Sequence, residues 1–187
     1  LFKDTYMLRY LITALTAAAV CGCSNLDISQ YKNQEPHLDL QAYLNGNISG
    51  VGIVQDRNHN VTKRFKFNGR GYWNGDNGKF DEIIAYSDGK VESRTWSFKK
   101  ISESSFEATT PDVIGKASIK LSGNSMNWQY TMNIKVDNST YAINFDDWMF
   151  LMDGGRIINR NYFTKFGLNV GELTLFMQKE SPDTPKK

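Results

Sequence analysis

The carboxylates that lie closest together in the sequence are Asp146 and Asp147, and Asp153 follows a few residues later. Two such groups can act as a general acid and base or hold a hard cation. Successive side chains of a β-strand point to opposite faces, so Asp146 and Asp147 cannot face one pocket unless a bulge intervenes. The favoured interpretation is therefore structural, with one carboxylate capping a turn and the other paired with an arginine.

Two dipeptides, Asp56-Arg57 and Asn159-Arg160, each place a guanidinium beside another polar group. At the mouth of a barrel, an arginine fork would bind a lipid carboxylate or phosphate. As a structural feature, the same residues would form an ion pair that holds the barrel ends together. The structural interpretation is favoured, and the binding interpretation stays open. The candidate polar cluster consists of Asp56, Asp146 and Asp147.

Aromatic side chains are the third group that could act in function. They are concentrated in the expected strands, at Trp96, Trp128, Tyr130, Tyr141, Phe145 and Trp148. As a plain core they need no ligand, whereas as the lining of an apolar cavity they would bind acyl chains or another hydrophobic molecule. The candidate ligand-binding residues, aromatic or cationic, are Trp128, Tyr130, Trp148, Arg57 and Arg160.

Other kinds of site find little support. His37 and His59 are isolated, and no Gly-x-Ser-x-Gly elbow or phosphate-binding loop occurs, so we expect no catalytic residue, metal or cofactor. Lys+Arg 22 against Asp+Glu 20 gives a net charge of +2, which offers no basic surplus for nucleic acid. The two cysteines, Cys21 and Cys23, are too close together to build a disulfide framework.

The N-terminal segment has the pattern of an exported protein. A basic start at Met7 to Arg9 precedes an apolar run that is too short to span a membrane but fits a signal peptide. Val20-Cys21-Gly22-Cys23 resembles the bacterial lipobox, which implies cleavage before Cys23 and lipid on its thiol. Ser24 stands where an inner-membrane retention signal has Asp, so by resemblance to Gram-negative sorting we expect an outer-membrane lipoprotein that faces the periplasm.

These signals divide the chain into four parts. We expect a signal peptide over residues 1–22, with Met7 as the initiator, and the lipidated Cys23 with a flexible tether over residues 23–36. A single domain over residues 37–180 and a disordered tail over residues 181–187 complete the chain. The tether is polar and ends at Pro36.

The body of the chain has the period of two that is typical of β-strands. From Met126 to Val136, apolar residues alternate with polar ones throughout, and short Gly, Asn and Asp clusters separate this run from its neighbours. The pattern predicts an all-β fold of eight to ten strands, an antiparallel up-and-down barrel that is lipocalin-like, with a β-sandwich as the alternative. Leu38 to Leu44 predicts one short helix. An outer-membrane barrel is disfavoured, because Lys63, Arg64 and Lys66 would face lipid.

Two further segments have a recognisable pattern: one runs from Gln55 to Phe65, and the other runs from Phe145 to Asp153 and continues through Asn159-Arg160 to Thr174. Both resemble the bacterial lipoproteins of domain-of-unknown-function family 3833. The resemblance covers about Leu38 to Lys179. It implies a lipoprotein signal, a lipocalin-like barrel and no established activity. The lipocalin Gly-x-Trp is absent, since Gly52 is followed by Ile53 and Val54.

Taken together, these patterns predict a lipoprotein that binds or carries a hydrophobic or lipid molecule without covalent chemistry. The alternative is a structural or interaction lipoprotein with a solid core that docks a partner in the envelope. A lipid-modifying enzyme is the least favoured, because only Asp146 and Asp147 support it. The expected partners are the membrane, through the N-terminal lipid, and a hydrophobic small molecule.

Overall fold

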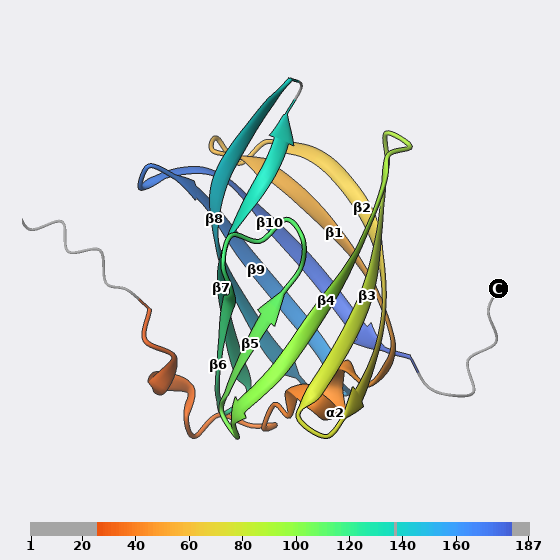
Figure 1. Ribbon diagram of the computed structural model, residues 1–187, viewed down its shortest axis with the longest axis vertical. Helices are drawn as coiled ribbons and strands as arrows, with labels where there is room; N and C mark the ends of the chain where they lie inside the picture. Colours follow the sequence, from red (N-terminus) through yellow and green to blue (C-terminus); the bar gives the residue numbers. More distant parts are fainter. Residues whose placement is uncertain (1–25, 137, 181–187) are drawn as a thin grey trace, which may run out of the picture.

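The computed structural model describes residues 26–136 and 138–180 (Figure 1). The expected signal peptide, Cys23 and the C-terminal tail lie outside these ranges. Two short helices precede ten strands. The helices are η1 (Ile28–Tyr31) and α2 (Leu40–Leu44), and the strands are β1 (Gly46–Asp56), β2 (Val61–Asn74), β3 (Asn77–Tyr86), β4 (Val91–Ser102), β5 (Ser105–Thr109), β6 (Ala117–Ser122), β7 (Ser125–Val136), β8 (Ser139–Met152), β9 (Arg156–Lys165) and β10 (Leu168–Lys179).

The ten strands form one closed antiparallel barrel. Each strand pairs with its neighbours in sequence, and β1 pairs with β10 from Ile48↔Lys179 to Asp56↔Gly171 to close the sheet. The expected up-and-down barrel is therefore confirmed, and the β-sandwich alternative is wrong. Because β5 and β6 are short, residues 91–96 of β4 and most of residues 130–136 of β7 have a strand partner on one side only. Every described helix and strand lies between Ile28 and Lys179, so a chain that starts at Ser24 includes all of them.

Alternation along β7 sorts its side chains as the sequence predicts. Trp128 and Met132 point into the barrel and are 7% and 2% exposed, whereas Gln129 between them points outward and is exposed. The outward-facing Asn127 is nevertheless buried, at 8% exposure. Its burial is explained by the N-terminal segment, which covers this part of the outer wall.

That N-terminal segment is ordered over the part that the structure describes. Asp27 caps η1 by accepting a hydrogen bond from the backbone N–H of Ser29, and Tyr31 packs edge-on against Phe150 with ring centroids 5.4 Å apart. The backbone N–H of Leu38 donates to Gly123 O at 2.9 Å. Residues 26–36, expected to be a flexible tether, therefore lie against the barrel, because apolar contacts to β8 offset the lost chain entropy.

Helix α2 closes one end of the barrel (Figure 1). Asp39 caps it through the backbone N–H of Ala42, and Leu40, Tyr43 and Leu44 are buried against the barrel interior. The expected helix over Leu38 to Leu44 is thus confirmed in shorter form. We call this end the closed end and the opposite one the open end. No helix among the described residues is long and apolar enough to cross a membrane.

Aromatic rings fill the interior by lying over glycines, at Gly69 near the closed end and at Gly52 further towards the open end. A Cβ built on Gly69 would lie 2.1 Å from Cζ of Phe80, and one on Gly52 would lie 2.3 Å from Cζ of Phe65. These glycines are inward-facing positions of β2 and β1, where the neighbouring ring takes the space of a side chain. The half of the barrel near α2 is therefore a packed core.

Candidate functional site

Burial of the inward-facing side chains falls from the closed end to the open end. Near α2, inward residues such as Ile48, Phe98 and Ile157 are at most 3% exposed. Towards the open end, several inward apolar residues are only half-buried although they pack against the same core, while Phe65 and Met132 stay buried at 4% and 2% exposure. The half-buried residues are Val54, Ile84, Ile134, Phe145 and Leu173. We call the part of the interior that they line the open half of the barrel.

The first polar group of the interior is an ion pair between β3 and β4. Arg94 Nη1 donates to Glu82 Oε1 at 3.0 Å, and the two residues are directly opposite in the strand register. Arg94 Nη2 also lies 3.7 Å from Asp112 Oδ2. Burial raises the pKa of Glu82, while the charge of Arg94 acts against that rise. The pair lies where the packed half meets the open half.

The second polar group is centred on Asp147, on the opposite wall. Its carboxylate accepts a hydrogen bond from Asn159 Nδ2, and the side chain is 6% exposed. Burial raises the pKa of Asp147 to about 8, and the hydrogen bond from Asn159 only partly opposes this rise. At neutral pH the carboxyl is therefore mostly protonated and able to donate a hydrogen bond.

Next to Asp147, Asn161 Nδ2 donates to the hydroxyl of Tyr130 at 3.3 Å. Burial raises the pKa of Tyr130 well above its ordinary value, so its hydroxyl stays neutral. Two buried polar atoms of this region, Trp128 Nε1 and Asn161 Oδ1, have no hydrogen-bond partner among the described residues. One is a donor and the other an acceptor, and each buried polar atom left unpaired costs stability. Unpaired polar atoms are not confined to this region, since the Tyr43 hydroxyl and Trp73 Nε1 near the closed end also lack a partner among the described residues.

The aromatic candidates from the sequence divide between the two faces of the sheet. Trp128 and Tyr130 point into the barrel, and Trp128 meets Trp96 edge-on at a centroid distance of 4.6 Å. Trp148 does not line the interior: it lies on the outer face, buried under Tyr31 at 6.1 Å, and its Nε1 donates to Asp146 Oδ2 at 3.2 Å. A molecule inside the barrel would not touch Trp148. The alternation along β8 explains this placement.

The polar candidates are likewise dispersed. Asp146 points outward and accepts from Asn127 Nδ2 at 2.7 Å, whereas Asp147 points inward, as the alternation predicts. Neither carboxylate has an arginine partner among the described ion pairs, which differs from the structural interpretation of the sequence. Asp56 caps the turn after β1 by accepting from the backbone N–H groups of Asn58 and Asn60 at 2.8 and 3.0 Å. The three acids therefore form no common site.

The two candidate arginines do not reach the interior either. Arg57 lies exposed in the β1–β2 turn. Arg160 is on the outer wall, where its Nη2 donates to Glu172 Oε2 at 2.8 Å, and His59 Nδ1 lies 3.2 Å from the other oxygen of the same carboxylate. The expected contact between the Asp56-Arg57 and Asn159-Arg160 dipeptides is thus replaced by an outer-wall cluster around Glu172.

Two lysines occupy the mouth instead. Lys63 and Lys165 are half-buried, at inward-facing positions of β2 and β9 close to the open end. Lys63 Nζ lies 4.8 Å from the ring centroid of Tyr86, and Lys165 Nζ lies 3.7 Å from that of Tyr141. Both lysines could have been assigned to the interior from the sequence, because residues two apart in a strand share a face. Lys63 lies two residues before the inward-facing Phe65, and Lys165 lies two residues after the inward-facing Phe163.

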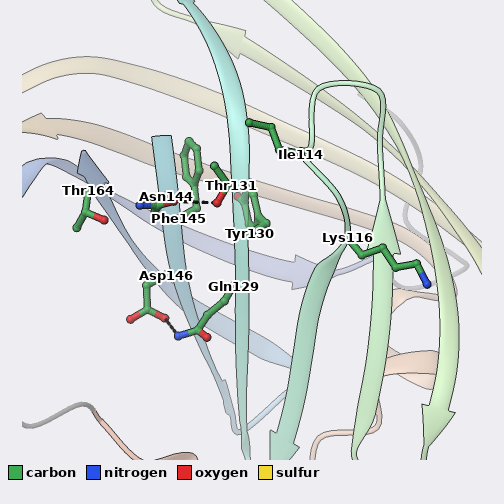
Figure 2. A pocket seen from close by; sticks show the side chains of 9 residues that line it. All are labelled: Ile114, Lys116, Gln129, Tyr130, Thr131, Asn144, Phe145, Asp146 and Thr164. Carbon is green, nitrogen blue, oxygen red and sulfur yellow. Dashed lines mark hydrogen bonds between the residues drawn. The ribbon is translucent and has the colours of Figure 1, made fainter. Parts of the chain in front are cut away.

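Two cavities are present on the outer wall. One, of about 490 Å³, lies where the β5–β6 connection passes over β7, β8 and β9 (Figure 2). Most of its side chains are outward-facing and polar, and Gln129 is hydrogen-bonded to Asp146 at 3.0 Å. The other, of about 320 Å³, lies over β10, β1 and β2 around Val51 and Phe176. Among the described residues, no three His, Cys, Asp or Glu side chains gather as a metal site would require.

Comparison with known proteins identifies a family and a fold. The family described as "Protein of unknown function (DUF3833)" matches residues 17–179. No curated protein matches the sequence. Among solved structures, the S-type phycobiliprotein lyase CPES from Guillardia theta is similar with a TM-score of 0.55 and 6% identity, over 76% of this chain and 91% of that chain. Rv2717c from M. tuberculosis is similar with a TM-score of 0.54 and 12% identity, over 80% of this chain and 100% of that chain. Similarity at such low identity shows the fold alone.

Proposed function

We propose a function from the barrel itself, because the chain belongs to the DUF3833 family, which has no known function. The barrel binds an amphiphilic small molecule, such as a lipid, in its open half and performs no covalent chemistry on it. Lipid on Cys23 holds the protein at the outer membrane, facing the periplasm.

The observation that carries this proposal is the change in burial along the barrel interior. Inward-facing apolar side chains are a packed core near α2, but at the open end Ile84, Ile134 and Leu173 face inward and are only half-buried. Apolar surface left accessible inside a barrel is stabilised when a hydrophobic ligand covers it. The packed half provides the rigid base that fixes the depth of such a ligand.

The ligand is amphiphilic because the open half ends on polar groups. Asp147 lies directly opposite Trp128 and Asn161 in the strand register, and the Glu82–Arg94 pair lies on the other wall. A pure hydrocarbon would leave Trp128 Nε1 and Asn161 Oδ1 unpaired, whereas a hydroxyl, amide or acid group supplies both an acceptor and a donor. At the mouth, Lys165 favours an anionic group at the outer end of the ligand, whereas the Lys63 ammonium already pairs with Asp88 at 3.3 Å.

The proposal is tested with the unlipidated chain that starts at Ser24 and with fatty acids that carry bromine on the acyl chain. Bromine quenches tryptophan emission at short range, and Trp96 and Trp128 lie in the interior. Replacing Trp148 by phenylalanine removes the signal from the outer wall. We expect saturable quenching with a dissociation constant in the low micromolar range, about 8 kcal/mol of net binding free energy.

Ile83 and Ile84 give a matched pair of variants. Ile84 faces the open half, and its neighbour Ile83 is outward-facing and 48% exposed. Ile84→Gln is expected to weaken binding about tenfold, since it removes the apolar contact of one side chain, whereas Ile83→Gln leaves binding unchanged. Equal effects of the two variants, or no quenching by any brominated acid, would refute binding in the open half.

The interaction lipoprotein remains a second candidate, supported by the outer-wall cavity of about 490 Å³ (Figure 2). Its polar lining at Gln129, Thr131 and Asn144 suits hydrogen bonds to a protein segment better than an acyl chain. Under this alternative, Thr131→Arg would abolish capture of the partner while leaving ligand quenching intact.

A further inference from the structure

Large apolar side chains are exposed at the turns of two adjacent hairpins, at the open end of the barrel. Phe166 is 90% exposed and Leu168 is 70% exposed in the β9–β10 hairpin, and Val170 follows at 42%. In the β7–β8 hairpin, Val136 and Tyr141 are 49% and 37% exposed. We call these five residues the apolar rim. Exposed apolar patches of this kind mark a binding surface.

The two hairpins are held together at this end. Strands β8 and β9 pair with each other up to Asn144↔Thr164, and Lys165 Nζ lies 3.7 Å from the ring centroid of Tyr141. The same ammonium lies 5.2 Å from the ring centroid of Phe166. The apolar rim is therefore one surface built from two hairpins, with a cation placed among its aromatic rings.

The backbone conformation at Phe166 is strained and therefore lowers the stability of the folded chain. Leu168 pairs with Lys165, so Phe166 and Gly167 form a two-residue turn, and their φ angles are +52° and +77°. Such turns favour Asn-Gly, and a bulky residue with positive φ is strained. Phe166 is also exposed to water, so neither its backbone nor its packing within this chain explains a phenylalanine there.

We propose that the apolar rim docks on the surface of a lipid bilayer and inserts Phe166 and Leu168 among the lipids. Single apolar side chains at hairpin tips can enter the interfacial region while the barrel stays in water. Aromatic rings and lysines are the residues preferred at that depth. This surface is separate from the lipid proposed on Cys23, and it borders the mouth of the interior site at Lys165.

Charge favours a membrane that contains anionic lipid. Lys135 and Lys165 belong to these hairpin ends, and the only acid in residues 135–141 and 164–170 of the sequence is Asp137, which the structure does not describe. A protein partner would more commonly meet a continuous apolar core with a polar rim. Here one lysine precedes the apolar residues in each hairpin, Lys135 before Val136 and Lys165 before Phe166, and a cation suits an anionic headgroup layer.

The test measures partition of the unlipidated chain starting at Ser24 onto sedimented vesicles. One set contains phosphatidylcholine alone, and the other also contains phosphatidylglycerol. We expect binding to the anionic set that weakens at high salt. Leu168→Asp is expected to lower the partition coefficient about tenfold, because the apolar area inserted by one such side chain is about 60 Å².

Ile101→Asp is the matched control. Ile101 is 55% exposed near the closed end, so the variant makes the same chemical change away from the apolar rim. Phe166→Asn separates docking from stability: it should lower the partition coefficient but not the melting temperature, since asparagine tolerates positive φ. Ile84→Gln should leave partition unchanged, which distinguishes this proposal from ligand binding.

Three results would overturn the proposal. The first is an absence of binding of the wild-type chain to both vesicle sets, and the second is an equal loss for Ile101→Asp and Leu168→Asp. The third is a change in self-association by sedimentation velocity for Leu168→Asp without a change in vesicle binding, which would assign the apolar rim to contacts between copies of this chain.

Discussion

Replacing Asp147 by asparagine is expected to stabilise the barrel at neutral pH. The Asp147 carboxyl is 6% exposed, and its burial raises the pKa from the ordinary value of 3.8 to about 8. Between these two pH values, the folded protein keeps a proton that the unfolded chain releases. The stability linked to this proton is therefore complete below pH 3.8 and is lost as the pH rises to about 8.

The size of the effect follows from the same linkage. Each pH unit within that window lowers the free energy of unfolding by at most about 1.4 kcal/mol. At pH 7 the wild type has lost at most about 4 kcal/mol of its free energy of unfolding, and relaxation of the interior reduces this loss. Because asparagine has no charge to bury, we expect Asp147→Asn to recover about 2–4 kcal/mol. Asparagine keeps the acceptor for Asn159 Nδ2 and adds a permanent donor near Asn161, which lies directly opposite in the register.

Urea denaturation at several pH values between about 5 and 8 measures the effect. The midpoint of the wild type should fall as the pH rises, and that of Asp147→Asn should fall less. Asp146→Asn is the neighbouring control, and it should gain no stability, because Asp146 faces outward and accepts hydrogen bonds from Asn127 and Gln129. If wild type and Asp147→Asn have the same pH dependence, the carboxyl is not held protonated and the reasoning is wrong.

Three further changes test the packing and the anchor. Gly69→Ala should cost about 1–3 kcal/mol, because its Cβ would lie 2.1 Å from Cζ of Phe80; thermal melts measure this loss, and an unchanged melting temperature would contradict the packing. Trp128→Ala should cost about 3–5 kcal/mol, whereas the outward Gln129→Ala costs little, and similar urea midpoints for the two variants would contradict the assigned faces. Cys23→Ser should abolish both lipidation and cleavage, and incorporation of labelled palmitate into that variant would show that the lipid is attached elsewhere.

The barrel could be predicted from the sequence because local patterns determine it. The alternation from Met126 to Val136 assigns the inward face of β7, and Gly, Asn and Asp clusters mark several turns between the long strands. The turn at Phe166 was not predicted, because a phenylalanine with positive φ is not a turn signal. The cover over Trp148 was missed as well, since it comes from Tyr31, which is distant in the sequence.

For the interior polar groups, the pairing of Glu82 with Arg94 could have been predicted from the sequence. Ser87-Asp88-Gly89 is a turn signal in the sequence, and the register of the hairpin that it centres places Glu82 opposite Arg94. Alternation alone does not reveal that both face inward at the same height as Asp147. That height depends on the stagger of all ten strands around the closed barrel, which no local pattern encodes.

The Glu82–Arg94 pair is hard to explain by stability alone. Removing two charges from water costs about as much as their attraction returns, and replacing a buried ion pair by apolar residues is often neutral or stabilising. The packed half of the same barrel shows that aromatic rings over glycines fill its interior without such a pair, as Phe80 does at Gly69. The pair occurs instead at the boundary of the open half, with unpartnered Trp128 Nε1 and Asn161 Oδ1 in the same part of the interior. A polar boundary beneath a half-buried apolar wall is what recognition of an amphiphile requires, and this is why we assign function to the interior rather than to the outer wall.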